Sequence, residues 1–217
     1  MTVVDPTLRH ERRLFREGAP LVIGCDEVGR GAIAGPVGVG LAVIGPHSRR
    51  MPQGLRDSKM LSEPRREQLY PEVGAWVAAG AVGLASNDEV ERIGIIAALG
   101  LAASRALQQL VDQDVPVAGA TVLLDGSHDW LTPALGTVRP TVTTRVKADR
   151  DCASVAAASV LAKVYRDRLM IEADRELPGY DWAGNKGYAS ASHYDAIDRL
   201  GPTRLHRWSW LRQPGLF

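Results

Sequence analysis

The chain has 217 residues, 45% of them hydrophobic, which suits one substantial core and is short for two full domains, so we expect a single domain over residues 1–217. It has 26 Lys and Arg and 25 Asp and Glu, so its net charge is +1, and this balance does not indicate which kind of partner the protein binds. Two cysteines exclude a disulfide framework or a paired-cysteine zinc site, and no apolar run is long enough to cross a bilayer, so we expect a cytoplasmic protein without membrane contact.

The first half of the chain carries three strand candidates and one long helix candidate. Residues 1–19 are arginine-rich with little periodicity, which indicates a loose or helical leader. The apolar run 21–25 predicts a first strand, and the β-rich run 37–44, following Gly35-Pro36, predicts its hairpin partner. Residues 76–85 are a third strand candidate. From Asn87, a candidate N-cap, helical spacing of apolar residues predicts a helix to Leu110.

The second half alternates strands and helices. Residues 121–124 and 141–146 predict two more strands, and residues 151–171 predict a helix whose many small residues would let it approach a sheet closely. Residues 186–217 look helical and loop-rich, with two acidic and five basic side chains, which suits either phosphate contact or a solvated tail. The predicted fold class is α/β, a mixed five-stranded sheet flanked by helices with a helical C-terminal region.

Four carboxylates follow predicted strands, where open α/β sheets gather their chemistry: Asp26, Glu27, Asp125 and Asp149. Any one of them alone is more often a turn former or a helix cap. If the first and fourth strands are neighbours, like charges crowd together and call for a divalent counterion. Hard oxygen ligands without His or Cys favour Mg²⁺ or Mn²⁺, and two such ions about 4 Å apart can hydrolyse a phosphodiester.

A dinucleotide-binding loop is the rival interpretation of the glycines at 29–34, which fit G-x-G-x-x-A after a strand. That fingerprint needs a helix to begin there, whereas Gly35-Pro36 and a second β-rich run follow. Asp26 and Glu27 would also place two negative charges beside a pyrophosphate. No G-K-[ST] follows a glycine run, which excludes a P-loop, so we interpret the glycines as allowing close approach of the backbone to another group.

Six ordered motifs span most of the chain: GCDEVGRG at 24–31, DSKMLS at 57–62, LDG at 124–126, KAD at 147–149, AAASVLAK at 156–163 and KGY at 186–188. In this order and spacing they resemble bacterial ribonuclease HII, the type 2 ribonuclease H family. The resemblance implies a ribonuclease H-like fold and assigns Asp26, Glu27, Asp125 and Asp149 as catalytic metal ligands, with two Mn²⁺ or Mg²⁺ ions expected in the active complex.

The resemblance also implies substrate contacts. Gly29, Arg30 and Gly31 would read the ribose 2′-OH through backbone groups, since that hydroxyl separates RNA from DNA at one position. Tyr188 would pack on the sugar at the ribonucleotide-deoxyribonucleotide junction. Lys59, Lys147 and Lys186 are candidate phosphate contacts, Lys59 first among them, although loop lysines are mostly solvated.

For several other residues the sequence predicts no part in the chemistry. Ser190 and Trp210 stand where the family usually has threonine and phenylalanine, away from the proposed chemistry. Asp151 is interpreted as a helix cap and Cys25 as a small buried hydrophobe pointing opposite to Asp26. His193 and His206 receive no catalytic role.

The activity implied is endonucleolytic hydrolysis 5′ of ribonucleotides, in RNA/DNA hybrids and at single ribonucleotides in duplex DNA, leaving 3′-OH and 5′-phosphate ends and serving ribonucleotide and RNA primer removal. Two alternatives stay open: a type 3-like ribonuclease H acting on long hybrids only, and a non-catalytic nucleic-acid-binding module. We favour type 2 because the Gly-Arg-Gly element is intact and only 23 residues precede the first motif, whereas type 3 enzymes carry an extra N-terminal domain.

The last five residues, Gln213 to Phe217, resemble the end of peptides that dock on the bacterial sliding clamp. Two large terminal apolar residues are costly to leave in water, so the tail either fills a pocket on a partner or folds back onto its own domain.

Overall fold

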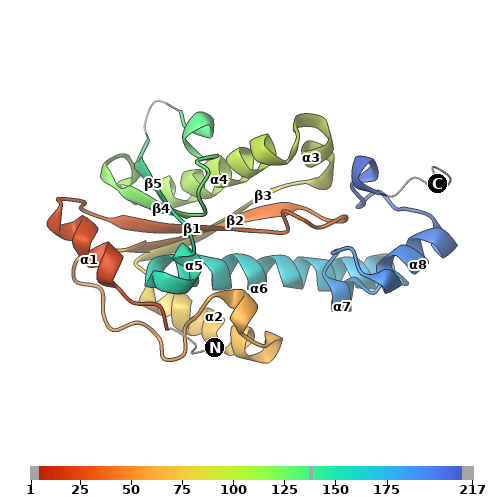
Figure 1. The fold of residues 1–217 in the computed structure, drawn as a ribbon, viewed down its shortest axis with the longest axis horizontal. Helices are drawn as coiled ribbons and strands as arrows, with labels where there is room; N and C mark the ends of the chain where they lie inside the picture. The colour runs from red at the N-terminus through yellow and green to blue at the C-terminus, as the bar shows by residue number, and fades with distance from the viewer. Residues whose placement is uncertain (1–4, 137–138, 212–217) are drawn as a thin grey trace.

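The structure is a computed structural model that describes residues 5–136 and 139–211, and it has three layers (Figure 1). A five-stranded mixed sheet of order β3-β2-β1-β4-β5 lies between helix α4 (Ile95–Val111) on one face and α6 (Ala153–Glu176) on the other. Helix α2 (Glu63–Trp76) packs outside α6. This confirms the predicted fold class.

The first two strands pair as the predicted hairpin, and the structure adds the pairing of the other three. β1 (Val22–Val28), β2 (Val37–Ile44) and β3 (Ala79–Ala85) form an antiparallel meander, and β4 (Thr121–Asp125) and β5 (Thr141–Arg145) continue the sheet in parallel with β1. β1 extends three residues beyond the apolar run because β2 keeps pairing with it, with Asp26 opposite Gly40 and Glu27 opposite Val39. The two acidic residues therefore lie within the strand rather than after it.

The helix predicted over 87–110 is two helices. α3 (Asn87–Ile93) ends at Gly94, whose φ of +79° interrupts the helix before α4 begins. The N-cap is Ser86 rather than Asn87: the Ser86 hydroxyl accepts from the Glu89 amide, and the Glu89 carboxylate accepts from the Ser86 amide. The Asn87 side chain instead donates to the Arg204 carbonyl, 2.8 Å away.

Helix α2 is absent from the sequence prediction, and its last residue, Trp76, was predicted to begin the third strand, which starts at Ala79. The helix contains Pro71 and buries only Leu69 and Val73, so its apolar stripe is too narrow to show as a helical period.

Helix α6 packs directly on the sheet through small residues, as predicted. A Cβ on Gly24 would lie 2.2 Å from the Ser154 carbonyl carbon, and one on Gly40 would lie 2.4 Å from the Ala158 oxygen. The helix begins at Ala153, two residues later than predicted, after the short helix α5 (Ala148–Asp151). The cap prediction for Asp151 is wrong, because its carboxylate instead accepts from Arg145 and Arg150.

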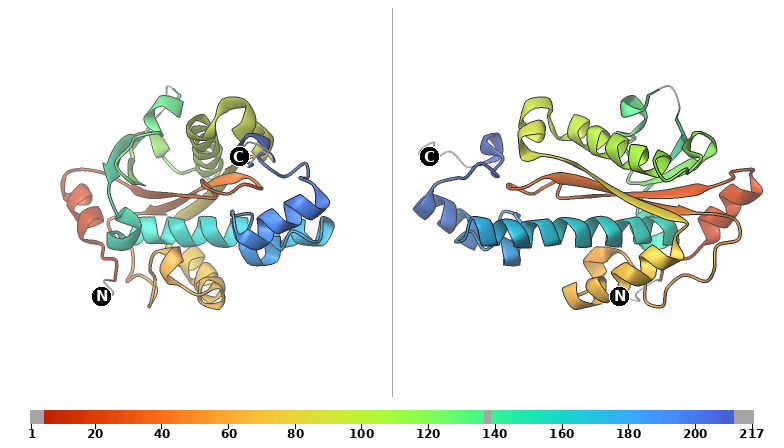
Figure 2. Two further views of the ribbon diagram at one scale, coloured as in Figure 1. Left: turned by 45° about the vertical axis from the view of Figure 1, so that its right-hand side comes forward. Right: turned by 180° about the vertical axis from the view of Figure 1, so that it is seen from behind.

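Both ends of the described chain are helical or turn-like. α1 (Arg9–Arg16) lies in the predicted leader, and α7 (Trp182–Asn185) and α8 (Ala191–Leu200) lie at the opposite end of the sheet (Figure 2). Four single 3₁₀ turns complete the described elements, at Ser58–Met60, Val117–Gly119, Thr132–Ala134 and Trp208–Trp210. No helix within the described ranges is both long and apolar enough to span a membrane.

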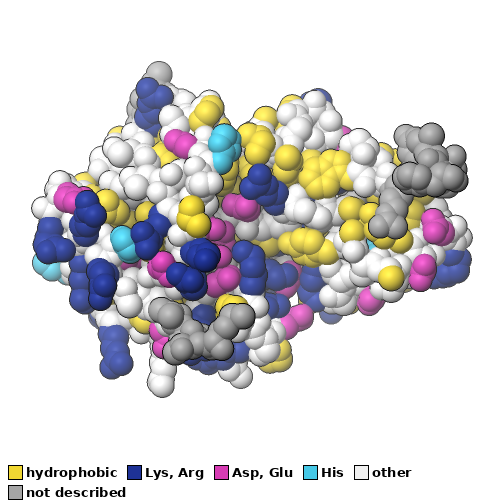
Figure 3. All heavy atoms as spheres, in the orientation of Figure 1, with side chains coloured by type: hydrophobic (Ala, Val, Ile, Leu, Met, Phe, Trp, Pro, Cys, Tyr) yellow, Lys and Arg dark blue, Asp and Glu magenta, His cyan; other side chains and the backbone are white. Residues whose placement is uncertain are grey.

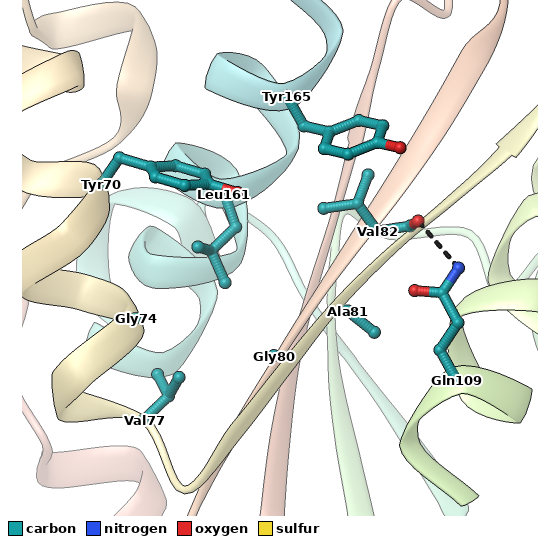
Figure 4. Close-up of a pocket in the computed structure, with 9 residues that line it drawn as sticks. All are labelled: Tyr70, Gly74, Val77, Gly80, Ala81, Val82, Gln109, Leu161 and Tyr165. Carbon is teal, nitrogen blue, oxygen red and sulfur yellow. Dashed lines mark hydrogen bonds between the residues drawn. The ribbon is translucent and has the colours of Figure 1, made fainter. Parts of the chain in front are cut away.

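Strand β3 is an outer strand of the sheet, and α4 covers its outward carbonyl groups. Three side chains at four-residue spacing donate to alternate carbonyl oxygens, namely Gln113 to Gly80 (3.4 Å), Gln109 to Val82 (3.1 Å) and Arg105 to Leu84 (2.8 Å). Figure 4 shows the middle contact beside a hollow of about 340 Å³ lined by Tyr70 and Tyr165, among others. No candidate site residue lines this hollow.

Candidate active site

Asp26 and Asp125 lie side by side at the centre of the sheet. The parallel register pairs Cys25 with Leu124, so the next residue on each strand carries a carboxylate. Asp26 is buried, and burial raises its pKa well above the usual range. The charges of Glu27 and Asp125 add to that rise, while Lys59 and the Ser159 hydroxyl oppose it. Cys25 is fully buried on the other face of the strand, as predicted.

Asp125 also brings the fourth carboxylate into place. Its Oδ1 accepts from the backbone amides of Ala148 (2.7 Å) and Asp149 (3.3 Å), which ties the start of α5 to the end of β4. Asp149 therefore lies in the first turn of α5 and not directly after β5. Burial raises the pKa of Asp125, and the neighbouring charge of Asp149 raises it further.

Lys59 lies among these carboxylates as a countercharge. Its Nζ is 3.4 Å from Asp149 Oδ2. Burial lowers the pKa of Lys59, but the charges of Asp26, Asp57 and Asp149 outweigh it and raise that pKa. Asp57 holds the turn, because its Oδ1 accepts from the Lys59 amide at 3.0 Å. Asp57 is the first residue of the DSKMLS motif, and no role was predicted for it from the sequence.

The donor set fits a hard divalent cation, because the gathered side chains supply carboxylate oxygens whose mutual repulsion such an ion would relieve. Across residues 5–136 and 139–211, however, no three His, Cys, Asp or Glu side chains already converge as ligands. Binding an ion at this site therefore requires the carboxylates to turn toward a common point.

The Gly-Arg-Gly loop, residues 29–31, meets the Tyr188 segment. The Gly29 amide donates to the Tyr188 hydroxyl at 3.2 Å, and Ala32 and Tyr188 form an isolated β-bridge. The Arg30 side chain reaches back to Glu27, with Nη1 3.4 Å from Oε1. The structure thus brings together the predicted ribose-reading residues, the predicted junction tyrosine and one predicted metal ligand.

The predicted phosphate-contacting lysines differ in their surroundings. Lys147 is exposed, in the left-handed conformation with φ of 61°. Lys186 is buried, and its ammonium contacts the Ala183 carbonyl and, at 3.1 Å, Glu63 Oε2 on α2. Lys186 therefore joins the C-terminal region to α2 in this conformation. Figure 3 shows acidic side chains near the middle of one face with Lys and Arg side chains around them.

The two histidines for which no catalytic role was predicted form a buried pair. His193 and His206 are fully buried, with their Nε2 atoms 3.2 Å apart, and His193 Nδ1 lies 2.9 Å from the Tyr188 carbonyl oxygen. Trp182 Nε1 donates to His193 at 3.0 Å. The pair thus anchors the Tyr188 backbone.

A mixed sheet of this order, with carboxylates at its two central parallel strands and a long helix packed across them, defines a nuclease of the ribonuclease H-like class. The chain belongs to the ribonuclease HII family, whose model matches residues 23–213. It is accordingly a metal-dependent ribonuclease H, a hydrolase that acts on nucleic acid hybrids.

Curated relatives share much of the sequence. A ribonuclease HII of Streptomyces griseus is 48% identical over 214 residues, covering 97% of this chain and 86% of the relative. One of Caulobacter vibrioides is 42% identical over 193 residues, covering 89% and 85%.

Solved structures share the fold. The ribonuclease H2 of Pyrococcus horikoshii superposes with a TM-score of 0.64 at 23% identity, covering 88% of this chain and 93% of that one. The ribonuclease HII of Archaeoglobus fulgidus, solved in complex with PCNA, gives 0.66 at 23% identity, covering 90% and 98%. The Bst ribonuclease HIII in complex with Mn²⁺ gives 0.66 at 25% identity, covering 85% and 64%.

Proposed function

We propose that this enzyme hydrolyses the phosphodiester on the 5′ side of ribonucleotides, both in RNA/DNA hybrids and at single ribonucleotides within duplex DNA, leaving 3′-OH and 5′-phosphate ends. The contact that supports this most is the hydrogen bond from the Gly29 amide to the Tyr188 hydroxyl. This hydrogen bond joins the Gly-Arg-Gly loop, which is suited to reading a 2′-OH, to the Tyr188 ring, which is suited to packing on the next sugar. Arg30 links that unit to Glu27 in the acidic cluster.

In this proposal Asp26, Glu27, Asp125 and Asp149 hold the metal. Two bound Mg²⁺ or Mn²⁺ ions would activate the attacking water and stabilise the leaving oxygen. Lys59, which lies beside Asp149, places a positive charge where a phosphate approaches. The 2′-OH is read by the backbone and does not attack, so the products carry no cyclic phosphate.

The test is an incision assay on three duplexes of one sequence: all DNA, a single embedded ribonucleotide, and one all-RNA strand. We expect metal-dependent incision of the second and third, abolished by EDTA, with ends that map 5′ of the ribonucleotide. Cleavage of the all-RNA strand alone would instead assign the type 3-like specificity. A 2′,3′-cyclic end would refute the proposed roles of water and metal.

We also propose that the tail binds a sliding clamp, as a way to reach newly replicated DNA. Residues 213–217 lie outside the described residues, so the support is the sequence pattern and the PCNA complex of the Archaeoglobus protein. Deleting residues 213–217 should abolish binding to purified clamp in a titration and leave cleavage of short duplexes unchanged. A marked fall in melting temperature without any clamp binding by the intact chain would show that the tail is part of the core.

A further inference from the structure

A fully buried arginine lies beneath the Gly-Arg-Gly loop. The Arg207 guanidinium donates to the carbonyl oxygens of Gly29 (2.9 Å), Arg30 (3.1 Å) and Gly35 (3.1 and 3.2 Å). Its Cζ lies 4.9 Å from the centre of the Trp210 ring. Within the described residues it forms no salt bridge, so its charge is compensated by loop carbonyl groups and not by a carboxylate.

Such a charge is expensive to bury, because carbonyl dipoles replace only part of its hydration. Burial, together with the neighbouring charge of Arg166, lowers the pKa of Arg207 to about 10. A hydrophobic side chain of similar volume would fill the same space without this penalty. The structure therefore gives the guanidinium a task beyond packing.

That task follows from the planarity of the peptide bond. In a trans peptide the N–H points opposite to the C=O, so fixing the Gly29 carbonyl directs the Arg30 amide away from Arg207. Fixing the Arg30 carbonyl does the same for the Gly31 amide. Neither amide has a hydrogen-bond acceptor in the part of the chain that the structure describes. Arg207 thus leaves two adjacent free donors facing away from the protein interior.

Arg166, also fully buried, holds the neighbouring arm of the loop. It donates to the carbonyl oxygens of Ala34 (3.0 Å), Pro36 (2.8 Å) and Lys186 (2.8 Å). A Cβ on Gly29 would lie 2.2 Å from Arg166 Nε, which explains a glycine there by packing. Arg166 therefore supports the scaffold, whereas Arg207 is the one of these two arginines that contacts the Gly29 and Arg30 carbonyls. The Gly29 carbonyl also accepts from the Ala32 amide, at 3.2 Å, which closes the turn of the loop.

We propose that Arg207 is a positioning residue for ribose recognition, which aims the Arg30 and Gly31 amides at the 2′ position of the substrate. This inference rests on the proposed function, in which the Gly-Arg-Gly loop reads the 2′-OH. It adds a residue of the C-terminal segment to that recognition, at a distance from the substrate.

The experiment is a cycle that crosses Arg207→Lys with a change of the 2′ group. Duplexes of one sequence carry a single ribonucleotide or a single 2′-fluoro nucleotide at the same site, and single-turnover cleavage in Mg²⁺ and Kd in Ca²⁺ are measured. Arg105→Lys is the matched control, because Arg105 also donates to a backbone carbonyl but lies on α4, and its other hydrogen bonds within the described chain go to Glu89, which is no candidate site residue.

We expect Arg207→Lys to slow cleavage at the ribonucleotide about tenfold or more, the scale of one well-aligned hydrogen bond. The 2′-fluoro penalty should shrink in Arg207→Lys, because both changes disturb the same contact. Affinity for an all-DNA duplex and the Mg²⁺ concentration for half-maximal rate should stay within about twofold of the parent, and Arg105→Lys should match the parent throughout.

Additive effects of the two changes, or an equal loss of affinity for the all-DNA duplex, would overturn the inference. If Arg207→Lys does not fold, Glu91→Ala replaces it, since Glu91 accepts from the Ser209 amide and hydroxyl and so anchors the turn after Arg207. The same cycle should then show a smaller non-additive effect, and an additive one refutes the role. Failure of the proposed function is seen separately, as absence of incision at a single ribonucleotide by the parent enzyme.

Discussion

At the scale of single residues, the two glycines that flank Arg30 differ in the physical reason for having glycine at that position. Gly29 has φ of +75° and packs against the Arg166 guanidinium, so both its conformation and its neighbour require glycine. Gly31 has an ordinary φ, and nothing lies within 4 Å of a Cβ built on it. The folded chain gives Gly31 no internal reason to be glycine, which suggests that the substrate needs the space.

We therefore expect Gly31→Ala to fold with an unchanged melting temperature and to lose about tenfold or more in kcat/KM on single-ribonucleotide duplexes, because the added methyl meets the sugar. Gly29→Ala should instead lose on the order of 1–3 kcal/mol of stability through strain and overpacking. Thermal melts and steady-state kinetics check both. Normal turnover by Gly31→Ala would contradict close approach of the substrate at this residue.

Asp125→Asn should abolish cleavage while the apo form stays as stable as the parent or becomes more so. Burial and the neighbouring charge of Asp149 raise the pKa of Asp125, so the substitution removes a charge that is costly in the apo form, and the amide oxygen can still accept from Ala148. Single-turnover cleavage at saturating Mg²⁺ and a melt in EDTA measure the two effects. Near-normal cleavage would refute Asp125 as a metal ligand.

At the scale of elements, the hairpin, the existence of β4 and β5 and the small-residue face of α6 were predictable, because each has a strong local signal. Helix α2 was not, because its stability comes from packing on α6 and not from a wide apolar stripe. The extension of β1 through Asp26 and Glu27 depends on pairing with β2, which no local pattern reports.

The candidate site was also predictable only in part, because some of its residues depend on tertiary contacts that no local pattern reports. The four carboxylates were found because they lie in or close after strands that apolar runs predict. Arg166 and Arg207 could not be found from the sequence, because arginine is ordinarily exposed and only the tertiary structure shows which carbonyl groups need a donor.

The covered edge of β3 leads to a prediction about self-association. Gln109 and Gln113 occupy carbonyl groups that a second chain could otherwise pair with. Gln109→Ala combined with Gln113→Ala should keep cleavage per molecule unchanged but form oligomers at high concentration, as light scattering would report. Gln108→Ala is the control, since Gln108 lies on the same helix and its side chain, among the described residues, forms its hydrogen bond with Asp112 and not with β3. A double variant as monomeric as the control would show that the edge needs no such cover.

At the scale of the whole molecule, the proposed recognition unit joins distant parts of the chain. The connection between β1 and β2 contacts the C-terminal segment in two ways. Ala34 forms an isolated β-bridge with His206, and the Arg207 amide donates to the Ile33 carbonyl at 2.7 Å. This segment has its own small core around Trp182. Because this core includes Ala34, which follows the Gly-Arg-Gly loop, it packs the loop and the C-terminal segment together.

Acid should weaken this core through its histidines. Burial, together with the charge of His193, lowers the pKa of His206 from an ordinary 6.5 to about 4. The unfolded chain then binds the proton more readily than the folded one, so stability is complete above about pH 6.5 and falls as the pH drops toward 4. The full effect is on the order of 3 kcal/mol.

Raised carboxylate pKa values act in the opposite direction, because buried Asp26 and Asp125 favour the folded state more as they become protonated. Comparing the parent with His206→Gln isolates the contribution of His206 to the pH dependence of stability, since both proteins have the same carboxylates. We expect the parent to lose more free energy of unfolding than His206→Gln between pH 6.5 and 4, by urea titration at each pH, although the variant is less stable at neutral pH. Parallel curves for the two proteins would show that the histidine pair does not set the acid stability, and that His206 is protonated as readily in the folded chain as in the unfolded one.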